Sequence, residues 1–197
     1  MKKILIATGN VGKYREILEV LGDLPIQFLS LADLNLKNDV AETGETFAEN
    51  ALLKAKTFFE KTKIPTIGED SGLSVAALAG ELGVKTRRWG AGENATDAEW
   101  LDFFLKRMAR EKNREATFSC AAAFFDGEKS EIFCGETRGK LADAPQCEIP
   151  AGIPVSALFV PDGFSKVFAA MSPAEKNAVS HRGKAIFQLK TFLEKNF

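Results

Sequence analysis

Histidine and cysteine are scarce in this chain of 197 residues, which contains one histidine and three cysteines. The single histidine, His181, excludes a metal site built from several imidazoles. Cys120, Cys134 and Cys147 are odd in number and show no Cys-x-x-Cys spacing, so the sequence indicates neither a disulfide framework nor a zinc site. We expect these cysteines to be small residues of the core or of a pocket wall.

The chain also lacks an excess of either charge and any long apolar run. Its 26 Lys and Arg residues nearly balance 27 Asp and Glu residues, for a net charge of -1, so no overall positive field attracts nucleic acid or an anionic membrane. The apolar runs fall far short of the roughly 18 residues of a membrane span, and the first ten residues do not resemble a secretory signal. We expect a cytoplasmic protein without nucleic-acid or membrane partners, in which a local basic pocket can still exist.

The composition is that of a folded protein. A hydrophobic content of 45% excludes a disordered or collagen-like chain, and 197 residues suffice for one substantial core. The proline-rich segment 144–163 is not an interdomain linker, because ordered elements are expected on both sides of it. We predict a single domain spanning residues 1–197.

Hydrophobic periodicity predicts strands mixed with helices. The expected strands and apolar runs cover residues 3–7, 64–67, 73–78, 116–125 and 130–138. One helix is expected after residue 13, and others cover residues 45–61, 96–109 and 180–195. A further helix is expected to start at residues 172–173. Asp126-Gly127 predicts a hairpin, and a glycine-containing turn is expected at 68–72. The fold class is therefore α/β or mixed α+β, with a mixed sheet and a cleft between two lobes.

Two expected helices place a cation on their apolar side. A step of about 100° per residue puts Lys54 in the middle of one apolar stripe and Arg182 in another, with His181 beside it. A buried cation is costly unless it reaches solvent or meets an anion, and His181 and Arg182 also lie near a helix N-terminus, which attracts anions. A negatively charged ligand would explain both helices; a packed stem with a solvated head is the alternative.

The turn at residues 8–13 is a third candidate for anion binding. Thr8, Asn10 and Lys13 offer donors ahead of a helix, and Gly9 and Gly12 permit close approach of the backbone. The spacing matches neither a P-loop nor the Gly-x-Gly-x-x-Gly pattern, so a plain connection between a strand and a helix is the alternative.

Carboxylates accompany these cations. Glu42 precedes an expected helix, and Glu69 and Asp70 follow an apolar strand, where open α/β sheets place ligand sites. Proteins usually hold Mg²⁺ with one or two carboxylates together with substrate phosphates, although adjacent carboxylates in a surface turn are ordinary. Cations, backbone amides and carboxylates together predict a polyphosphate site with a divalent metal.

Four motifs occur in order along nearly the whole chain. They read Thr8-Gly9-Asn10-x-x-Lys13, Glu42-Thr43-Gly44-x-Thr46-Phe47-x-x-Asn50-Ala51-x-x-Lys54-Ala55, Asp70-Ser71-Gly72-Leu73 and Glu175-Lys176-Asn177-x-x-Ser180-His181-Arg182. Together they resemble the inosine triphosphate pyrophosphatase family, which removes nonstandard purine nucleoside triphosphates. The resemblance implies Mg²⁺-dependent hydrolysis of ITP, dITP or XTP to the monophosphate and pyrophosphate, by a homodimer with an elongated two-lobed fold around a cleft.

The resemblance also implies roles for individual residues. The triphosphate would be held by Thr8, Asn10, Lys13, Lys54 and Ser71, and the metal by Glu42 and Asp70, with Glu69 beside them. Asp70 is the preferred general base, with Lys54 and Glu69 as its catalytic neighbours; a role for Asp70 only as a metal ligand is the alternative. The nucleobase would meet Lys176, His181 and Arg182, with Ser156 at the position of a base-binding aspartate.

The sequence departs from the family in the base pocket. Residues 153–157 replace the family's Phe-Gly-Tyr/Trp-Asp-Pro element, so its stacking aromatic ring and its aspartate are missing, and Trp89 is a candidate substitute with core packing as the alternative. Family members often carry Asp at position 69. Two alternatives to the hydrolysis of nonstandard purine nucleotides are therefore the same chemistry with altered base specificity and a nucleotide-binding module with little turnover. A further alternative is a relative of the septum-associated nucleotide pyrophosphatases, but the motif at 180–182 argues against it.

Overall fold

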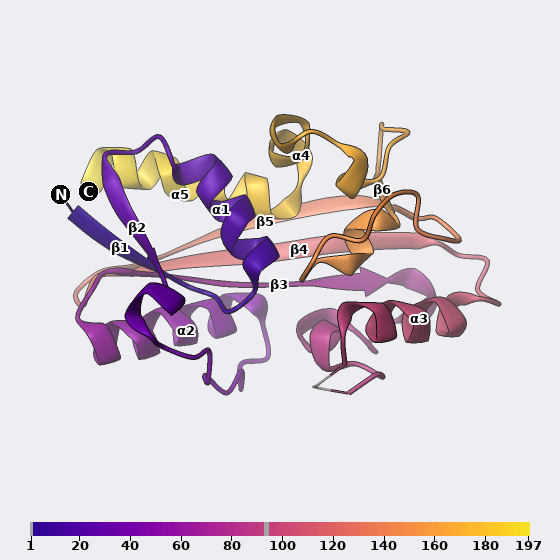
Figure 1. The fold of residues 1–197 in the computed structure, drawn as a ribbon, viewed down its shortest axis with the longest axis horizontal. Helices are drawn as coiled ribbons and strands as arrows, with labels where there is room; N and C mark the ends of the chain where they lie inside the picture. The colour runs from indigo at the N-terminus through magenta and orange to yellow at the C-terminus, as the bar shows by residue number, and fades with distance from the viewer. Residues whose placement is uncertain (1, 93–94) are drawn as a thin grey trace.

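A mixed six-stranded sheet runs along the length of the elongated molecule, with helices on both of its faces (Figure 1). The computed structural model describes residues 2–92 and 95–197. The elements, in chain order, are β1 (Lys2–Ala7), α1 (Val11–Leu21), β2 (Ile26–Ser30), η1 (Ala32–Leu34), α2 (Phe47–Thr62), β3 (Thr66–Val75), η2 (Ala76–Leu78), η3 (Gly83–Arg88), α3 (Asp97–Met108), β4 (Glu115–Phe125), β5 (Ser130–Leu141), η4 (Pro154–Ala157), β6 (Phe159–Pro161), η5 (Phe168–Ala170), α4 (Pro173–Val179) and α5 (His181–Asn196).

The strand order β2-β1-β3-β4-β5-β6 joins a parallel part to an antiparallel part. β1 is parallel to β2 and to β3, whereas β3 to β6 pair antiparallel. Helices α1 and α5 pack together on one face, and α2 covers the other face near the same end (Figure 1). The predicted α/β class with a mixed sheet is confirmed.

The expected turn at 68–72 is wrong, because these residues lie inside the ten-residue strand β3. β3 pairs with β4 from Thr66 to Val75 without interruption. Its glycines serve packing instead of a turn: a Cβ at Gly68 would overlap the carbonyl oxygen of Ala51 in α2. β1, by contrast, pairs with β3 only as far as Ala7 opposite Gly68, so β1 ends just before the two carboxylates of β3.

The predicted helices and the hairpin are confirmed, with starts set by local caps. α2 begins at Phe47 because the Thr46 hydroxyl accepts the Glu49 amide at 3.1 Å and the Glu49 carboxylate accepts the Thr46 amide. Equivalent capping boxes start α3 and α4, and Ser180 caps α5. Strands β2 and β6 were not predicted.

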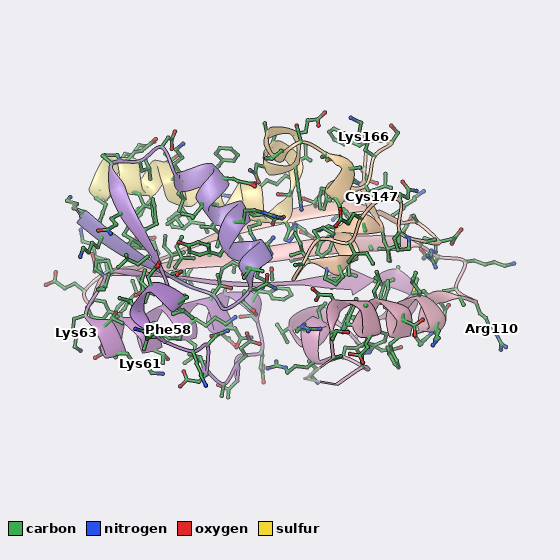
Figure 2. The ribbon with its side chains drawn as sticks, in the orientation of Figure 1. Phe58, Lys61, Lys63, Arg110, Cys147 and Lys166 are labelled. Atoms are coloured by element: carbon green, nitrogen blue, oxygen red, sulfur yellow. The ribbon has the colours of Figure 1, made fainter. Side chains whose placement is uncertain are left out.

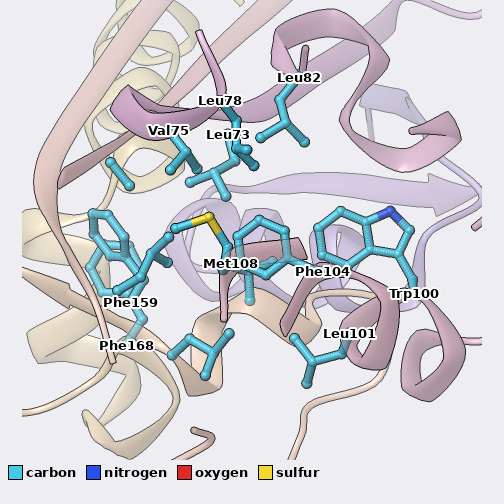
Figure 3. Close-up of a cluster of buried hydrophobic side chains, with 14 of the residues drawn as sticks. Leu73, Val75, Leu78, Leu82, Trp100, Leu101, Phe104, Met108, Phe159 and Phe168 are labelled. Atoms are coloured by element: carbon cyan, nitrogen blue, oxygen red, sulfur yellow. The ribbon is translucent and has the colours of Figure 1, made fainter. Parts of the chain in front are cut away.

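Two large hydrophobic clusters lie at opposite ends of the sheet. One joins α1 and α5 to the sheet; the other joins α3 to the far ends of β3 and β6 and contains Trp100, Phe104 and Phe159 (Figure 3). Trp89 packs onto this second cluster, 5.2 Å from Phe103 between ring centroids, which agrees with the core-packing alternative. Charged side chains such as Arg110 lie on the outside of the molecule (Figure 2).

The outer edge of β5 is covered by side chains from α5. In the described part of the chain β6 pairs only with residues 139–141 of β5. Upstream, Gln188 donates to the carbonyl of Cys134 at 2.8 Å, and Lys184 donates to the carbonyl of Glu136 at 2.7 Å. Within residues 2–92 and 95–197, none of the helices could cross a membrane.

Because α2 presses directly on β3, we predict that Gly68→Ala lowers the free energy of unfolding by about 3 kcal/mol. The added methyl group must push the backbone of Ala51 away. Ser74→Ala is the matched control, since Ser74 is exposed on the same strand. Denaturant unfolding of both variants measures the difference; equal stability of the two would contradict the close approach.

Candidate active site

A cavity of about 250 Å³ opens where β1 ends, beside the middle of β3. Its lining comes from the turn before α1, from α2, β3 and η3, and from the segments around η4 and α5. The predicted substrate- and metal-binding residues all line it: Thr8, Asn10, Lys13, Glu42, Lys54, Asp70, Ser71, Ser156, Lys176, His181 and Arg182. Segments far apart in the sequence therefore meet at one place, as expected at the carboxyl ends of parallel strands.

The neighbouring carboxylates of β3, Glu69 and Asp70, lie on opposite faces of the sheet, because successive side chains of a strand alternate. Asp70 meets Lys54 of α2, while Glu69 meets Lys13 of α1 and Arg182 of α5. Glu69 is 1% exposed and is absent from the residues that line the cavity. The structure therefore places Asp70 in the wall and Glu69 behind it.

Lys54 is held by carboxylates that approach from two sides. Its ammonium lies 2.6 Å from Glu42 Oε1 and 2.9 Å from Asp70 Oδ1, and it donates to the Glu69 carbonyl. Burial raises the pKa of Asp70 and outweighs the opposing influence of Lys54. Glu42 also pairs with Arg88 at 3.2 Å. The cation on the apolar side of α2 is thus paired with carboxylates of the chain itself, which neither sequence-based interpretation, a charged ligand or a solvated head, had predicted.

Arg182 is the second buried cation, and it joins three elements. Its Nε donates to Glu69 at 3.1 Å, one Nη donates to Ser71 at 2.8 Å, and the other pairs with Glu16 of α1. Burial alone would raise the pKa of Glu69, but Lys13 and Arg182 lower it far below its ordinary value. Glu69 is therefore ionised, and it fixes two cations of the cavity.

Glu16 is a site residue that the sequence analysis missed. It is 4% exposed, it lines the cavity, and it pairs with both Lys176 and Arg182. A helical step of about 100° places it beside Val20 on the buried side of α1. The helical periodicity that predicts a buried cation at Lys54 therefore also predicts a buried carboxylate at Glu16.

One part of the cavity wall is apolar. Ile153, Pro154 and Val155 line it, and Ser156 lies 3.5 Å from the ammonium of Lys176. Two aromatic residues also line the cavity, Trp100 and Phe118, whereas Trp89 is not among its lining residues.

His181 also lines the cavity, where it is stacked on an aromatic ring. Its imidazole lies on Phe118 with 4.6 Å between ring centroids. Burial lowers the pKa of His181 well below its ordinary value, so the imidazole is neutral at pH 7. Its Nδ1 finds no hydrogen-bond partner among the residues that the structure describes.

Glu42 and Asp70 are the carboxylates of the cavity wall that a divalent cation could use, and both bind Lys54. Glu42 and Asp70 converge on one point, the Lys54 ammonium, and no group of three or more His, Cys, Asp or Glu in ranges 2–92 and 95–197 could hold a metal ion. Two carboxylates without further protein ligands suit an ion such as Mg²⁺, which keeps water and substrate oxygens in its coordination sphere.

Cations outnumber carboxylates around the cavity. Six basic side chains line it against three carboxylates, and Glu69 lies behind the wall. The six are Lys13, Lys54, Arg87, Arg88, Lys176 and Arg182. The fold and this cavity define an α/β protein with a predominantly basic cleft at the carboxyl ends of its parallel strands.

This chain belongs to the Ham1 family, whose model matches residues 4–192. It is 37% identical to a dITP/XTP pyrophosphatase of Aquifex aeolicus, covering 95% of this chain and 94% of that protein. It is also 37% identical to the dITP/XTP pyrophosphatase of Coxiella burnetii, covering 100% of this chain and 99% of that protein. These matches confirm the family resemblance seen in the four motifs.

Solved structures agree with the fold. A HAM1 protein from Coxiella burnetii superposes with a TM-score of 0.82 at 36% identity, covering 99% of this chain and 100% of the other. The Ham1 protein of Staphylococcus aureus gives a TM-score of 0.81 at 32% identity and full coverage of both chains.

The two buried cations that share Glu16 make this residue a test of the network. We predict that Glu16→Gln lowers the free energy of unfolding at pH 7 by about 3 kcal/mol, because Lys176 and Arg182 lose a buried counter-ion. Glu19→Gln is the control on the same helix, since Glu19 is more exposed and is absent from the cavity lining.

The pH dependence gives a second readout of the same variant. Burial would raise the pKa of Glu16, but Arg182 and Lys176 lower it below its ordinary value of 4.5. The stabilisation by Glu16 is therefore present above pH 4.5 and is lost as the pH falls through the lower folded value. Unfolding curves should show the gap between wild type and Glu16→Gln narrowing in acid; a constant gap would contradict the ionised pairing.

Proposed function

We propose that this protein hydrolyses nonstandard purine nucleoside triphosphates, namely ITP, dITP and XTP, to the monophosphate and pyrophosphate. One observation carries the proposal: the Lys54 ammonium is clamped between Glu42 and Asp70 in a cavity that six basic side chains line. Family membership and the names of the relatives, dITP/XTP pyrophosphatases, support the same reaction.

The phosphate end of the proposed site is built from cations and a helix start. Lys13, Lys54 and the amides near Asn10 would hold the triphosphate, with Thr8 and Ser71 beside it. Glu42 and Asp70 would hold Mg²⁺, which when bound neutralises charge on the phosphates. Glu69 supports this end indirectly, by fixing Lys13 and Arg182.

Asp70 is the proposed general base. Burial raises its pKa, so it accepts a proton more readily than an exposed aspartate does. In the proposed step the oxygen of a water attacks the α-phosphorus and its proton passes to Asp70. The bond from this phosphorus to the bridging oxygen breaks, and pyrophosphate leaves. Lys54 would hold the Asp70 carboxylate in place.

The residues that we expect to contact the nucleobase support a preference for 6-oxopurines. They are also compatible with the alternative that the protein acts on a different base. Lys176 and the first residues of α5, His181 and Arg182, supply donors for a 6-oxo group, and Ser156 lies beside Lys176. The wall formed by Ile153, Pro154 and Val155 is apolar, which favours the alternative that the same chemistry acts on a different base.

The proposal extends to assembly and location, on the resemblance alone. We propose a homodimer in the cytoplasm. Light scattering coupled to gel filtration tests the dimer, and a monomer at micromolar concentration would contradict it.

The substrate proposal is tested by pyrophosphate release with Mg²⁺ across ITP, XTP, dITP, the standard triphosphates and pyrimidine analogues. We expect the three nonstandard purines to be hydrolysed fastest and turnover to be lost when EDTA removes the metal. Preference for another base would support the altered-pocket alternative, and binding without turnover would support a nucleotide-binding module.

The residue assignment is tested by Asp70→Asn and Lys54→Ala. Each should lower kcat by about 100-fold or more, because a proton acceptor or a phosphate cation is removed. Lys56→Ala is the matched control, since Lys56 is exposed on the same helix as Lys54. Circular dichroism verifies folding of the variants; near-normal turnover in both would overturn the assignment.

A further inference from the structure

Gly152 joins two parts of the molecule that lie far apart in the sequence. Its carbonyl accepts the side-chain amide of Asn10 at 2.7 Å, and its backbone N–H donates to Asp97 Oδ2 at 2.5 Å. Asn10 caps α1, whereas Asp97 is the first residue of α3. The segment before η4 therefore spans the space between the starts of these two helices (Figure 1).

The fit around Gly152 is tight. Its φ of +79° is a left-handed conformation that favours glycine, and a Cβ there would overlap Asn10 Oδ1. The same contact is tight when viewed from α1, because a Cβ at Gly12 would come within 2.6 Å of the carbonyl oxygen of Ala151. The chain at 151–152 is thus pressed against the first turn of α1.

Asn10 keeps its own position without Gly152. Its Oδ1 accepts the amides of Gly12 at 3.0 Å and Lys13 at 3.1 Å, which fixes the phosphate turn. Gly152 has no comparable support, because its two backbone groups are held by one side chain each. Loss of the Asp97 contact therefore falls on the segment 152–156 and leaves the phosphate turn in place.

That segment forms the apolar wall of the cavity, where Gly152, Ile153, Pro154, Val155 and Ser156 line it. Asp97 itself does not line the cavity. A carboxylate that accepts a backbone N–H makes a charge-assisted hydrogen bond, stronger than a neutral one. Asp97 can thus set the position of the wall without contacting the ligand.

We propose that Asp97 is a positioning residue that holds the 152–156 wall, through Gly152, at the nucleobase end of the cavity. The inference rests on the proposed function for the identity of the ligand. It predicts that affinity for a nucleotide depends on Asp97, whereas affinity for a ligand without a base does not.

The test compares wild type, Asp97→Ala, Asp97→Asn and the control Asp102→Ala. Asp102 is on the same helix, and its side chain, 62% exposed, pairs with Lys106. Each protein is assayed for KM and kcat with ITP and for inhibition by inorganic triphosphate, which has no base. Equilibrium binding of both ligands is measured by calorimetry in EDTA, where no turnover is expected.

For Asp97→Ala we expect KM and the dissociation constant for ITP to rise about tenfold, the value of one charge-assisted hydrogen bond. The kcat and the inhibition constant of triphosphate should change less than twofold. Asp97→Asn, which keeps a neutral acceptor, should lie between Asp97→Ala and wild type, and Asp102→Ala should match wild type.

Three results would overturn the inference: an unchanged KM, equal losses for ITP and triphosphate, or a loss of thermal stability without any change in the ratio of the two affinities. Failure of the proposed function looks different, because wild type would then hydrolyse none of the nucleotides. The calorimetric comparison still decides the role of Asp97 in that case, since weaker binding of ITP to Asp97→Ala than to wild type needs no turnover.

Discussion

The buried guanidinium of Arg182 is the interaction on which the site depends. It enters from α5 and binds Glu16 on α1 together with Glu69 and Ser71 on β3. A buried charge is tolerated only when its partners are in place, so these three elements must pack in one relative arrangement. The planar fork of arginine serves three acceptors at once, which an ammonium group could not do with the same geometry.

Strand lengths place the cavity. β1 stops at Ala7, opposite Gly68, while β3 continues to Val75. The open edge of β3 beyond Gly68 can therefore be reached from both faces of the sheet. Alternation along the strand sends Asp70 toward α2 and Glu69 toward α1 and α5. One strand thus supports two charge networks, and Glu42, from the segment between η1 and α2, completes the network that contains Asp70.

Features encoded by local sequence could be predicted, and features that depend on distant packing could not. The caps at Thr96 and Ser172 and the cations on the apolar sides of α2 and α5 were found from spacing alone. Gly68 signalled a turn, because nothing local reveals that α2 presses on it. The three-residue strand β6 and the contact of Asn10 with Gly152, 142 positions away, arise only in the folded chain.

Glu16 and the aromatic residues that line the cavity are parts of the site that the sequence did not predict. Glu16 lies at a helical position that predicts burial, but it carries a negative charge, whereas the signal for an anion site came from buried cations. Trp100 and Phe118 line the cavity while Trp89 does not. Trp100 belongs to α3, so its position at the cavity depends on how α3 packs on the sheet. Membership of the family and the departure at residues 153–157 could be predicted from the sequence; the contacts that hold this segment needed the structure.

The side chains that α5 lays along β5 also limit how copies of this chain can associate. An exposed strand edge is a template for pairing with another strand, and natural proteins block such edges. Gln188 and Lys184 already bind the carbonyls of Cys134 and Glu136. A strand of a second molecule that paired along this part of β5 would first have to displace these two side chains from the carbonyls that they already bind.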